Sequence, residues 1–172
     1  VYKTGGDIRY YDPSRKLRFF IGVQKERNVY KGTDVMLRAL ERVVADYPAE
    51  CEMYKAESLP FEEYCGMVDE CDVLLDQLYG YSPAMNALLA MSKGKVVVGG
   101  AEEDCYGIIG EKELRPMINV VPDEEDVYNK LVWLVESRGG VAGMQRDSVE
   151  FVVRHHDPSK VARQYIDFWQ ER

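Results

Sequence analysis

Short apolar runs alternate along the chain with longer stretches in which apolar residues recur at every third or fourth position. The short runs have the length of β-strands, and their apolar residues are continuous, which is typical of strands buried on both faces. Five segments are predicted to be strands: Leu17–Val23, Cys51–Lys55, Asp72–Leu75, Lys95–Val98 and Pro116–Val121. Because helix-period stretches separate most of these strands, we expect a parallel sheet with helices on both faces.

The helix-period stretches have recognisable starts and stops. Ser82 as N-cap and Pro83 at the first helical position predict a helix that runs to Lys93, and Gly94 ends it. Asp123 and Asp157 are expected to cap two later helices. The other predicted helices are Thr33–Tyr47, Pro60–Val68, Glu124–Ser137, Val141–Arg154 and a last one from Pro158 to near the C-terminus.

The length of 172 residues suits one domain of the usual ~100–200 residues. We therefore expect one doubly wound, Rossmann-like α/β domain of about five parallel strands over residues 17–172. Residues 1–16 are polar and turn-rich and are predicted to be an extended lead-in segment. The chain begins at Val1, without an initiator Met or a signal-peptide pattern, so we interpret it as a fragment.

Charge and cysteine content narrow the classes of partner. The 22 basic and 30 acidic residues give a net charge of −8, which disfavours nucleic acid and anionic lipid as main partners. No apolar run approaches the ~20 residues that span a bilayer, so no transmembrane segment is expected. The four cysteines have no C-x-x-C spacing, which favours free thiols in a reducing cytoplasm over a zinc site.

Ligands of doubly wound sheets bind outside the carboxyl ends of the strands, so the loops there are the candidate site. They are Gln24–Gly32, Ala56–Leu59, Asp76–Ser82 and Gly99–Tyr106. The first loop carries Lys25, Arg27 and Lys31 just before a helix N-terminus, an arrangement that suits phosphate oxygens. The alternative is an ordinary solvated loop.

The third loop is a second candidate contact for an anion or a hydroxyl-rich group. Gly80 permits close backbone approach before a helix N-terminus. Tyr79 and Tyr81 have rings that suit stacking on a sugar or a base, although partly buried packing is the commoner role of tyrosine. His155, His156 and Asp157 are interpreted as a loop with a helix cap rather than as a metal site.

Three motifs in order resemble those of family-four GT-B glycosyltransferases. Lys31-Gly32-Thr33-Asp34, with Ala39 beyond it, resembles K-G-x-D/E-x-x-x-x-A. The stretch that begins at Tyr64, YCGMVDECDVLLDQLYG, resembles Y-x-x-A-D-V-x-x-x-P-S, and AMSKGKVVV, which begins at Ala90, resembles E-A-M-A-x-G-K-P-V-V. The resemblance covers about residues 17–170 and implies the C-terminal half of such an enzyme, which holds a nucleotide-sugar donor.

The resemblance also implies roles for individual residues. It assigns the donor diphosphate to Lys25, Arg27 and Lys31, the nucleotide base to Glu57 and Ser58, and the donor sugar and phosphate to Asp76, Gly80, Tyr81 and Ser82. The implied substrate is a UDP- or GDP-sugar, with no cofactor and no metal. The implied activity is sugar transfer to a saccharide or lipid-linked acceptor in glycan or polysaccharide biosynthesis. The acceptor-binding N-terminal domain is missing, so the isolated domain is expected to be inactive.

Two departures from the family pattern keep alternatives open. The family has two glutamates eight positions apart, and here Tyr81 and Leu89 stand in their places. Leu89 cannot accept hydrogen bonds from ribose hydroxyls, so Asp76 substitutes for the second glutamate or the chain is a catalytically inactive binding module. The chain also has room for five strands where the family commonly has six.

A receiver-type signalling domain is disfavoured. It shares the architecture, and Asp76 would mimic its phosphoacceptor, but Gln24-Lys25 replaces the paired acids it needs. The resemblance implies a cytoplasmic location, or a peripheral one at the inner membrane in the full-length protein.

Overall fold

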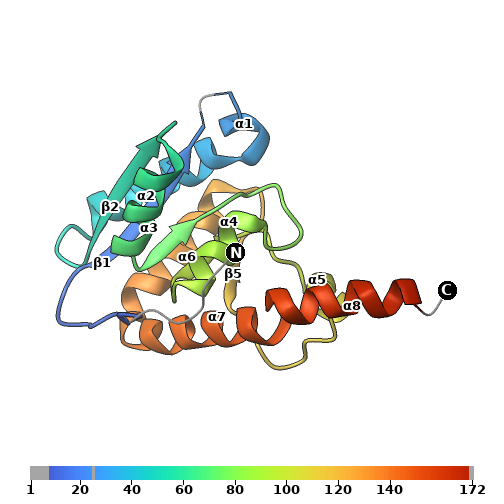
Figure 1. The fold of residues 1–172 in the computed structure, drawn as a ribbon. Helices are drawn as coiled ribbons and strands as arrows, with labels where there is room; N and C mark the ends of the chain where they lie inside the picture. Colours follow the sequence, from blue (N-terminus) through green and yellow to red (C-terminus); the bar gives the residue numbers. More distant parts are fainter. Residues whose placement is uncertain (1–7, 25, 171–172) are drawn as a thin grey trace.

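Five parallel strands form the centre of the molecule, between helices on both faces (Figure 1). The computed structural model describes residues 8–24 and 26–170. The strands are β1 (Leu17–Val23), β2 (Cys51–Glu57), β3 (Val73–Leu75), β4 (Val96–Gly99) and β5 (Met117–Asn119). Their order across the sheet is β2-β1-β3-β4-β5, and every pairing is parallel. The predicted fold class is therefore confirmed.

Successive side chains of the central strands pack into two separate cores. Phe19 and Ile21 of β1 belong to one cluster, whereas Phe20 belongs to the other, because side chains of a strand point alternately to opposite faces. All three are fully buried, and each such side chain contributes about 1.5–3 kcal/mol. The first face is covered by α2 (Thr33–Asp46) and α6 (Glu124–Glu136), the second by α3 (Phe61–Glu70), α4 (Met85–Ser92) and α7 (Val141–His155).

Some local features differ from those predicted from the sequence. Helix α4 begins at Met85, so the prediction that Ser82 and Pro83 start it is wrong. The chain before it stays irregular because the backbone N–H of Glu102 donates to the carbonyl of Tyr81 at 3.1 Å, which fixes these residues outside the helix. Two short helices were not predicted: α1 (Asn28–Lys31) in the first loop and α5 (Glu103–Ile108), which begins within the expected loop Gly99–Tyr106.

The segment before β1 is tied to the amino ends of the strands. Tyr11 is buried in the first core, and its backbone N–H donates to the side chain of Gln145 at 2.7 Å. The guanidinium of Arg15 donates two hydrogen bonds, of 2.6 and 2.7 Å, to the buried carboxylate of Asp72. Asp72 directly precedes β3. These bonds therefore hold the segment before β1 at the amino ends of the strands, opposite to the loops expected to bind ligand.

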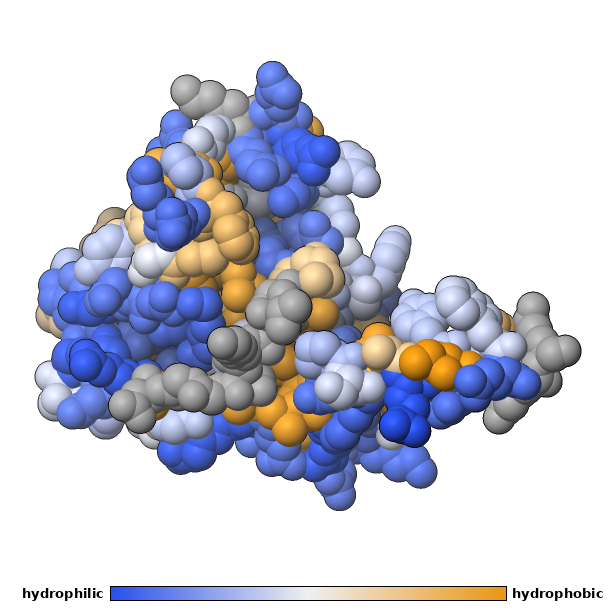
Figure 2. Space-filling view, in the orientation of Figure 1, coloured by the Kyte–Doolittle hydropathy of each residue, from blue (hydrophilic) through white to orange (hydrophobic). Residues whose placement is uncertain are grey.

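Both predicted acidic helix caps are confirmed. Asp123 accepts the backbone N–H of Asp126 at 2.9 Å, and Asp157 accepts those of Ser159 and Lys160 at 3.0 Å. The last helix, α8 (Pro158–Gln170), extends away from the body of the molecule, and none of these described residues is buried (Figure 1). Apolar surface is visible along this helix in Figure 2. Its residue Ile166 is half-exposed.

Two further features concern partner classes. All four cysteines lie in the described part of the chain and are free thiols, two of them buried. Within residues 8–24 and 26–170, none of the helices has the length and apolar character needed to cross a membrane.

Candidate functional site

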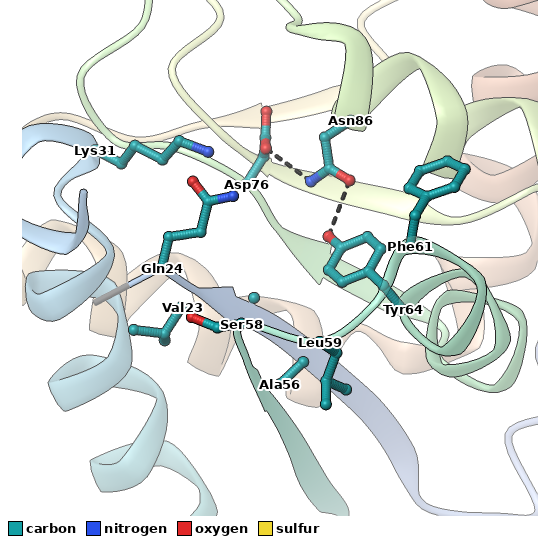
Figure 3. A pocket seen from close by; sticks show the side chains of 11 residues that line it. Val23, Gln24, Lys31, Ala56, Ser58, Leu59, Phe61, Tyr64, Asp76 and Asn86 are labelled. Atoms are coloured by element: carbon teal, nitrogen blue, oxygen red, sulfur yellow. Dashed lines mark hydrogen bonds between the residues drawn. The ribbon is translucent and has the colours of Figure 1, made fainter. Parts of the chain in front are cut away.

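A pocket of about 340 Å³ lies at the carboxyl ends of β1, β2 and β3 (Figure 3). The chain passes from β1 to β2 on one side of the sheet, then returns to β3 and continues to β4 and β5 on the other. The carboxyl ends of β1 and β3 therefore flank the topological switch point, where open α/β sheets bind their ligands.

A hydrogen-bonded chain of three polar side chains lies in the pocket. The hydroxyl of Tyr64 donates to Oδ1 of Asn86 at 2.9 Å, and Nδ2 of Asn86 donates to Oδ1 of Asp76 at 2.9 Å (Figure 3). Asp76 is only 7% exposed, and this burial raises the pKa of its carboxyl, while the Asn86 hydrogen bond and the charge of Lys31 act in the opposite direction. Burial also raises the pKa of Tyr64 far above its ordinary value. The pocket thus contains a desolvated carboxyl with an ordered amide beside it.

Gly22 of β1 makes room for the aromatic member of this chain. A Cβ at this position would lie 2.8 Å from Cε2 of Tyr64, closer than real Cβ contacts. The Tyr64 ring also packs on Phe20, with ring centroids 5.2 Å apart. Any larger residue at Gly22 would push the phenol, and with it the orientation of Asn86.

One side of the pocket is cationic. Lys31 ends α1, and its side chain points into the pocket towards Asp76 (Figure 3). Its carbonyl accepts the backbone N–H groups of Leu78 at 2.8 Å and Tyr79 at 3.4 Å, which joins the first loop to the third. Gly32 follows with φ 69° and is the N-cap of α2, so the positive end of a 14-residue helix begins beside this lysine.

The opposite side is mainly apolar. It is formed by Ala56 at the end of β2 and by Leu59 and Phe61 at the start of α3. Phe61 is 72% exposed, which leaves its ring available to a ligand. Ser58 lies on this side with φ 49°, a left-handed conformation that is uncommon for a residue other than glycine and is enriched at binding sites.

A second, smaller pocket of about 140 Å³ lies beyond the third loop and is lined by Gly80, Tyr81 and Glu102, among others. The third loop between the two pockets is tightly held. The N–H of Gly100 donates to the carbonyl of Gln77 at 3.0 Å, and a Cβ on Gly100 would lie 1.7 Å from the carbonyl oxygen of Gly80. This contact allows only glycine at position 100.

The structure brings some of the expected site residues together and separates others. Lys31, Ser58 and Asp76 line the first pocket. Gly80 and Tyr81 line the second. Among the described residues, the following expected ones are exposed and line neither pocket: Arg27, Glu57 (in an ion pair of 2.7 Å with Lys55) and Ser82. Lys25 lies outside the described residues.

Among the polar residues of the pocket, Tyr64 and Asn86 lie outside the predicted loops, and Gln24 lies in the first loop but had no predicted role. Asn86 carried a usable signal, since it is a lone polar residue in the apolar stretch that begins at Ala84. Leu89, where the family places a glutamate, is partly buried, belongs to neither core cluster and does not line the described pocket. Helix α4 instead presents Asn86, one turn earlier, to the cavity.

The histidine pair has a structural partner. Nε2 of His155 lies 2.6 Å from Oε2 of Glu111, whose carboxylate also accepts the backbone N–H groups of Glu113 and Leu114. These backbone bonds and the histidine contact lower the pKa of Glu111 to about 2. Within the described ranges, no group of three or more His, Cys, Asp or Glu side chains is placed to hold a metal ion.

Comparison with solved structures identifies the fold. The chain superposes on HepE from Anabaena, solved with UDP and glucose, with a TM-score of 0.66 and 11% identity over 93% of this chain and 50% of that one. A TarM variant from S. aureus, solved with UDP and saccharide ligands, gives 0.64 and 11% over 93% and 37%. The catalytic domain of the Helicobacter pylori cholesterol-α-glucosyltransferase gives 0.54 and 14% over 80% and 98%.

Sequence comparison adds no relative: no family model matches the chain, and no curated protein matches it. The chain spans half or less of the length of the HepE and TarM chains. At this level of identity the superpositions establish the fold, and the motif resemblance points to the same architecture. The chain has the fold of one Rossmann-like half of a GT-B glycosyltransferase.

Proposed function

We propose that this chain is the C-terminal, donor-binding domain of a GT-B glycosyltransferase. The enzyme would transfer a sugar from a nucleotide diphosphate sugar to a saccharide or lipid-linked acceptor in glycan or polysaccharide biosynthesis. One observation carries the proposal: the pocket at the switch point combines a cationic side at Lys31, a buried polar chain at Asp76 and an apolar side at Phe61. A nucleoside diphosphate presents the matching chemistries in one molecule.

The parts of the donor are assigned by these matches. Lys31 and the N-terminus of α2 hold the diphosphate, because free backbone N–H groups and an ammonium both stabilise anions. Lys25 and Arg27 belong to the same loop in the sequence and are assigned to the diphosphate as well. Ser58 and the apolar side of the pocket at Phe61 bind the nucleotide base. Glu57 is assigned to the base as well, although its exposed side chain does not line the pocket.

The donor sugar lies towards the second pocket. Gly80 and Tyr81 line it, and Ser82 follows them in the same loop. Two of the solved neighbours, HepE and the TarM variant, hold UDP, which supports a nucleotide ligand. No metal or organic cofactor takes part in this proposal. The domain acts in the cytoplasm or at the periphery of the inner membrane, with an N-terminal acceptor domain completing the enzyme.

Calorimetric titration with UDP and GDP tests the proposal. The wild-type chain should bind at least one of them, and Lys31→Glu should weaken that binding by tenfold or more, because a charge-assisted contact contributes ~1.5–3 kcal/mol. Lys130→Glu is the matched control, since Lys130 is exposed on α6 and lines neither pocket. A folded wild-type chain that binds neither nucleotide would favour the inactive binding module instead.

A further inference from the structure

We propose that Asp76 and Asn86, positioned by Tyr64, recognise the two neighbouring hydroxyls of the ribose and make the pocket selective for ribonucleotides over their 2′-deoxy analogues. This inference rests on the proposed nucleotide ligand. It assigns hydroxyl recognition to the end of β3 and the first turn of α4. It thereby gives a role to a buried carboxyl group for which the described residues provide one hydrogen-bond donor.

The carboxylate of Asp76 is the first step in the argument. Its side chain is almost completely buried, and Asn86 supplies a hydrogen bond to Oδ1. No described residue donates a hydrogen bond to Oδ2, although Lys31 is close enough to influence the charge. Because Asp76 lines the pocket, Oδ2 is free to take a hydrogen bond from a ligand there, and an ionised carboxylate can only accept. The ligand group that satisfies it is therefore a donor such as a hydroxyl, and an anion is disfavoured there.

The amide of Asn86 is the second step. Because the Asp76 carboxylate needs a donor, Nδ2 must face it, and Oδ1 then faces the hydroxyl of Tyr64. This arrangement fixes which end of the amide is which. Nδ2 has a second N–H, which can donate to the oxygen of a ligand hydroxyl. An acceptor and a donor thus lie side by side, which matches a pair of adjacent hydroxyls, each of which donates and accepts.

The position of this pair between the two sides of the pocket is the third step. In Figure 3, Asp76 and Asn86 lie between Lys31 on one side and Phe61 on the other. In a nucleoside diphosphate the ribose likewise joins the charged diphosphate to the flat base. A ligand with its phosphates at Lys31 and its base against the apolar side therefore brings its ribose to the carboxylate. The apolar Leu89, which does not line the pocket, need not take part.

The test compares UDP with 2′-deoxy-UDP by calorimetry, or the GDP pair if only GDP binds. The wild-type chain should bind the ribonucleotide about tenfold more tightly, as expected when a site built for a hydroxyl meets an analogue that lacks it. Asp76→Asn should reduce this ratio to about threefold or less, because the acceptor for both hydroxyls is weakened. Asn86→Ala provides a second route to the same reduction if Asp76→Asn does not fold.

Two controls separate the possible failures. Lys31→Ala should weaken both nucleotides by the same factor and leave the ratio unchanged, since it acts on the diphosphate. Asp34→Asn removes a negative charge from the first turn of α2 outside the pocket lining and should also leave the ratio unchanged. If UDP binds with no preference over its deoxy analogue, or if the folded Asp76 and Asn86 variants keep the preference, the inference is overturned while the proposed function stands. If no nucleotide binds the wild-type chain, the proposed function itself fails.

Discussion

Nδ2 of Asn86 donates a hydrogen bond of 2.9 Å to Oδ1 of Asp76, across the gap between the end of β3 and the first turn of α4. Burial of the Asp76 carboxyl raises its pKa. The pocket therefore contains a carboxyl group whose ionisation is less favourable in the folded chain than in water. Active and binding sites commonly contain such groups, and they lower stability in exchange for recognition.

The first prediction concerns Asp76→Asn and pH. Burial raises the pKa of Asp76 in the folded state above its ordinary value of 3.8, so the folded chain binds the proton more tightly than the unfolded chain. Stability due to this group is therefore greatest at low pH and falls as the pH rises from about 3.8 through the raised folded pKa. At pH 7 the neutral amide should stabilise the chain by about 1 kcal/mol.

Thermal denaturation of both proteins between pH 4 and pH 8 measures this effect. The advantage of Asp76→Asn should shrink as the pH falls, because the wild-type carboxyl then becomes neutral as well. Asp34→Asn, at a half-buried position in the first turn of α2, serves as the control and should not show the same pH-dependent gain. A wild-type chain that is the more stable of the two at pH 7 would mean that the pocket holds the carboxylate favourably ionised.

The second prediction concerns Gly100, which packs against the backbone of the third loop. Gly100→Ala places a Cβ 1.7 Å from the carbonyl oxygen of Gly80, and backbone must move to relieve the clash. The expected destabilisation is about 3 kcal/mol or more, at the upper end of overpacking costs. Both pockets adjoin this loop, so nucleotide affinity should fall as well.

Gly107→Ala is the matched control. Gly107 lies in α5, and a Cβ there meets nothing within 4 Å. Replacing a helical glycine with alanine should stabilise the chain by up to ~1 kcal/mol through the helix propensity of alanine. Denaturant titration of the two variants should therefore give changes of opposite sign, and equal changes would contradict the packing of Gly100 against Gly80.

The third prediction concerns neighbouring leucines of α4. Leu88 is 8% exposed and belongs to the second core, whereas Leu89 is only partly buried and belongs to neither core cluster. Leu88→Glu should cost several kcal/mol, because it buries an unpaired carboxylate. Leu89→Glu should cost about 1 kcal/mol or less, because its carboxylate can reach water.

Chemical denaturation of both variants decides this point, with UDP titration as a second measurement. Because Leu89 does not line the described pocket, Leu89→Glu should leave nucleotide affinity within about twofold of wild type. A strong gain in affinity would place position 89 in contact with the ligand, as the family motif implies. A loss of stability as large as that of Leu88→Glu would assign Leu89 to the core.

Features that depend on a few consecutive residues were predicted from the sequence. The run Leu17–Val23 gave β1 with its observed bounds, because a continuous apolar segment of that length is a strand buried on both faces. Asp123 and Asp157 were recognised as caps since a capping carboxylate bonds to backbone two or three residues away. The alternation of strands and helices gave the parallel sheet, and the cationic loop after β1 gave Lys31.

Features that depend on contacts between distant segments were decided by the tertiary structure alone. The start of α4 moved to Met85 because the third loop bonds to the loop after β4, a constraint that no local cap signal contains. The polar chain of the pocket joins Tyr64, Asp76 and Asn86 from α3, β3 and α4, and it forms only because Gly22 of β1 leaves space for the phenol. The sequence by itself determined the layers of the fold and the cationic loop after β1. Packing between elements decided which side chains meet in the pocket, because these meetings depend on the register of strands and helices that are far apart in the chain.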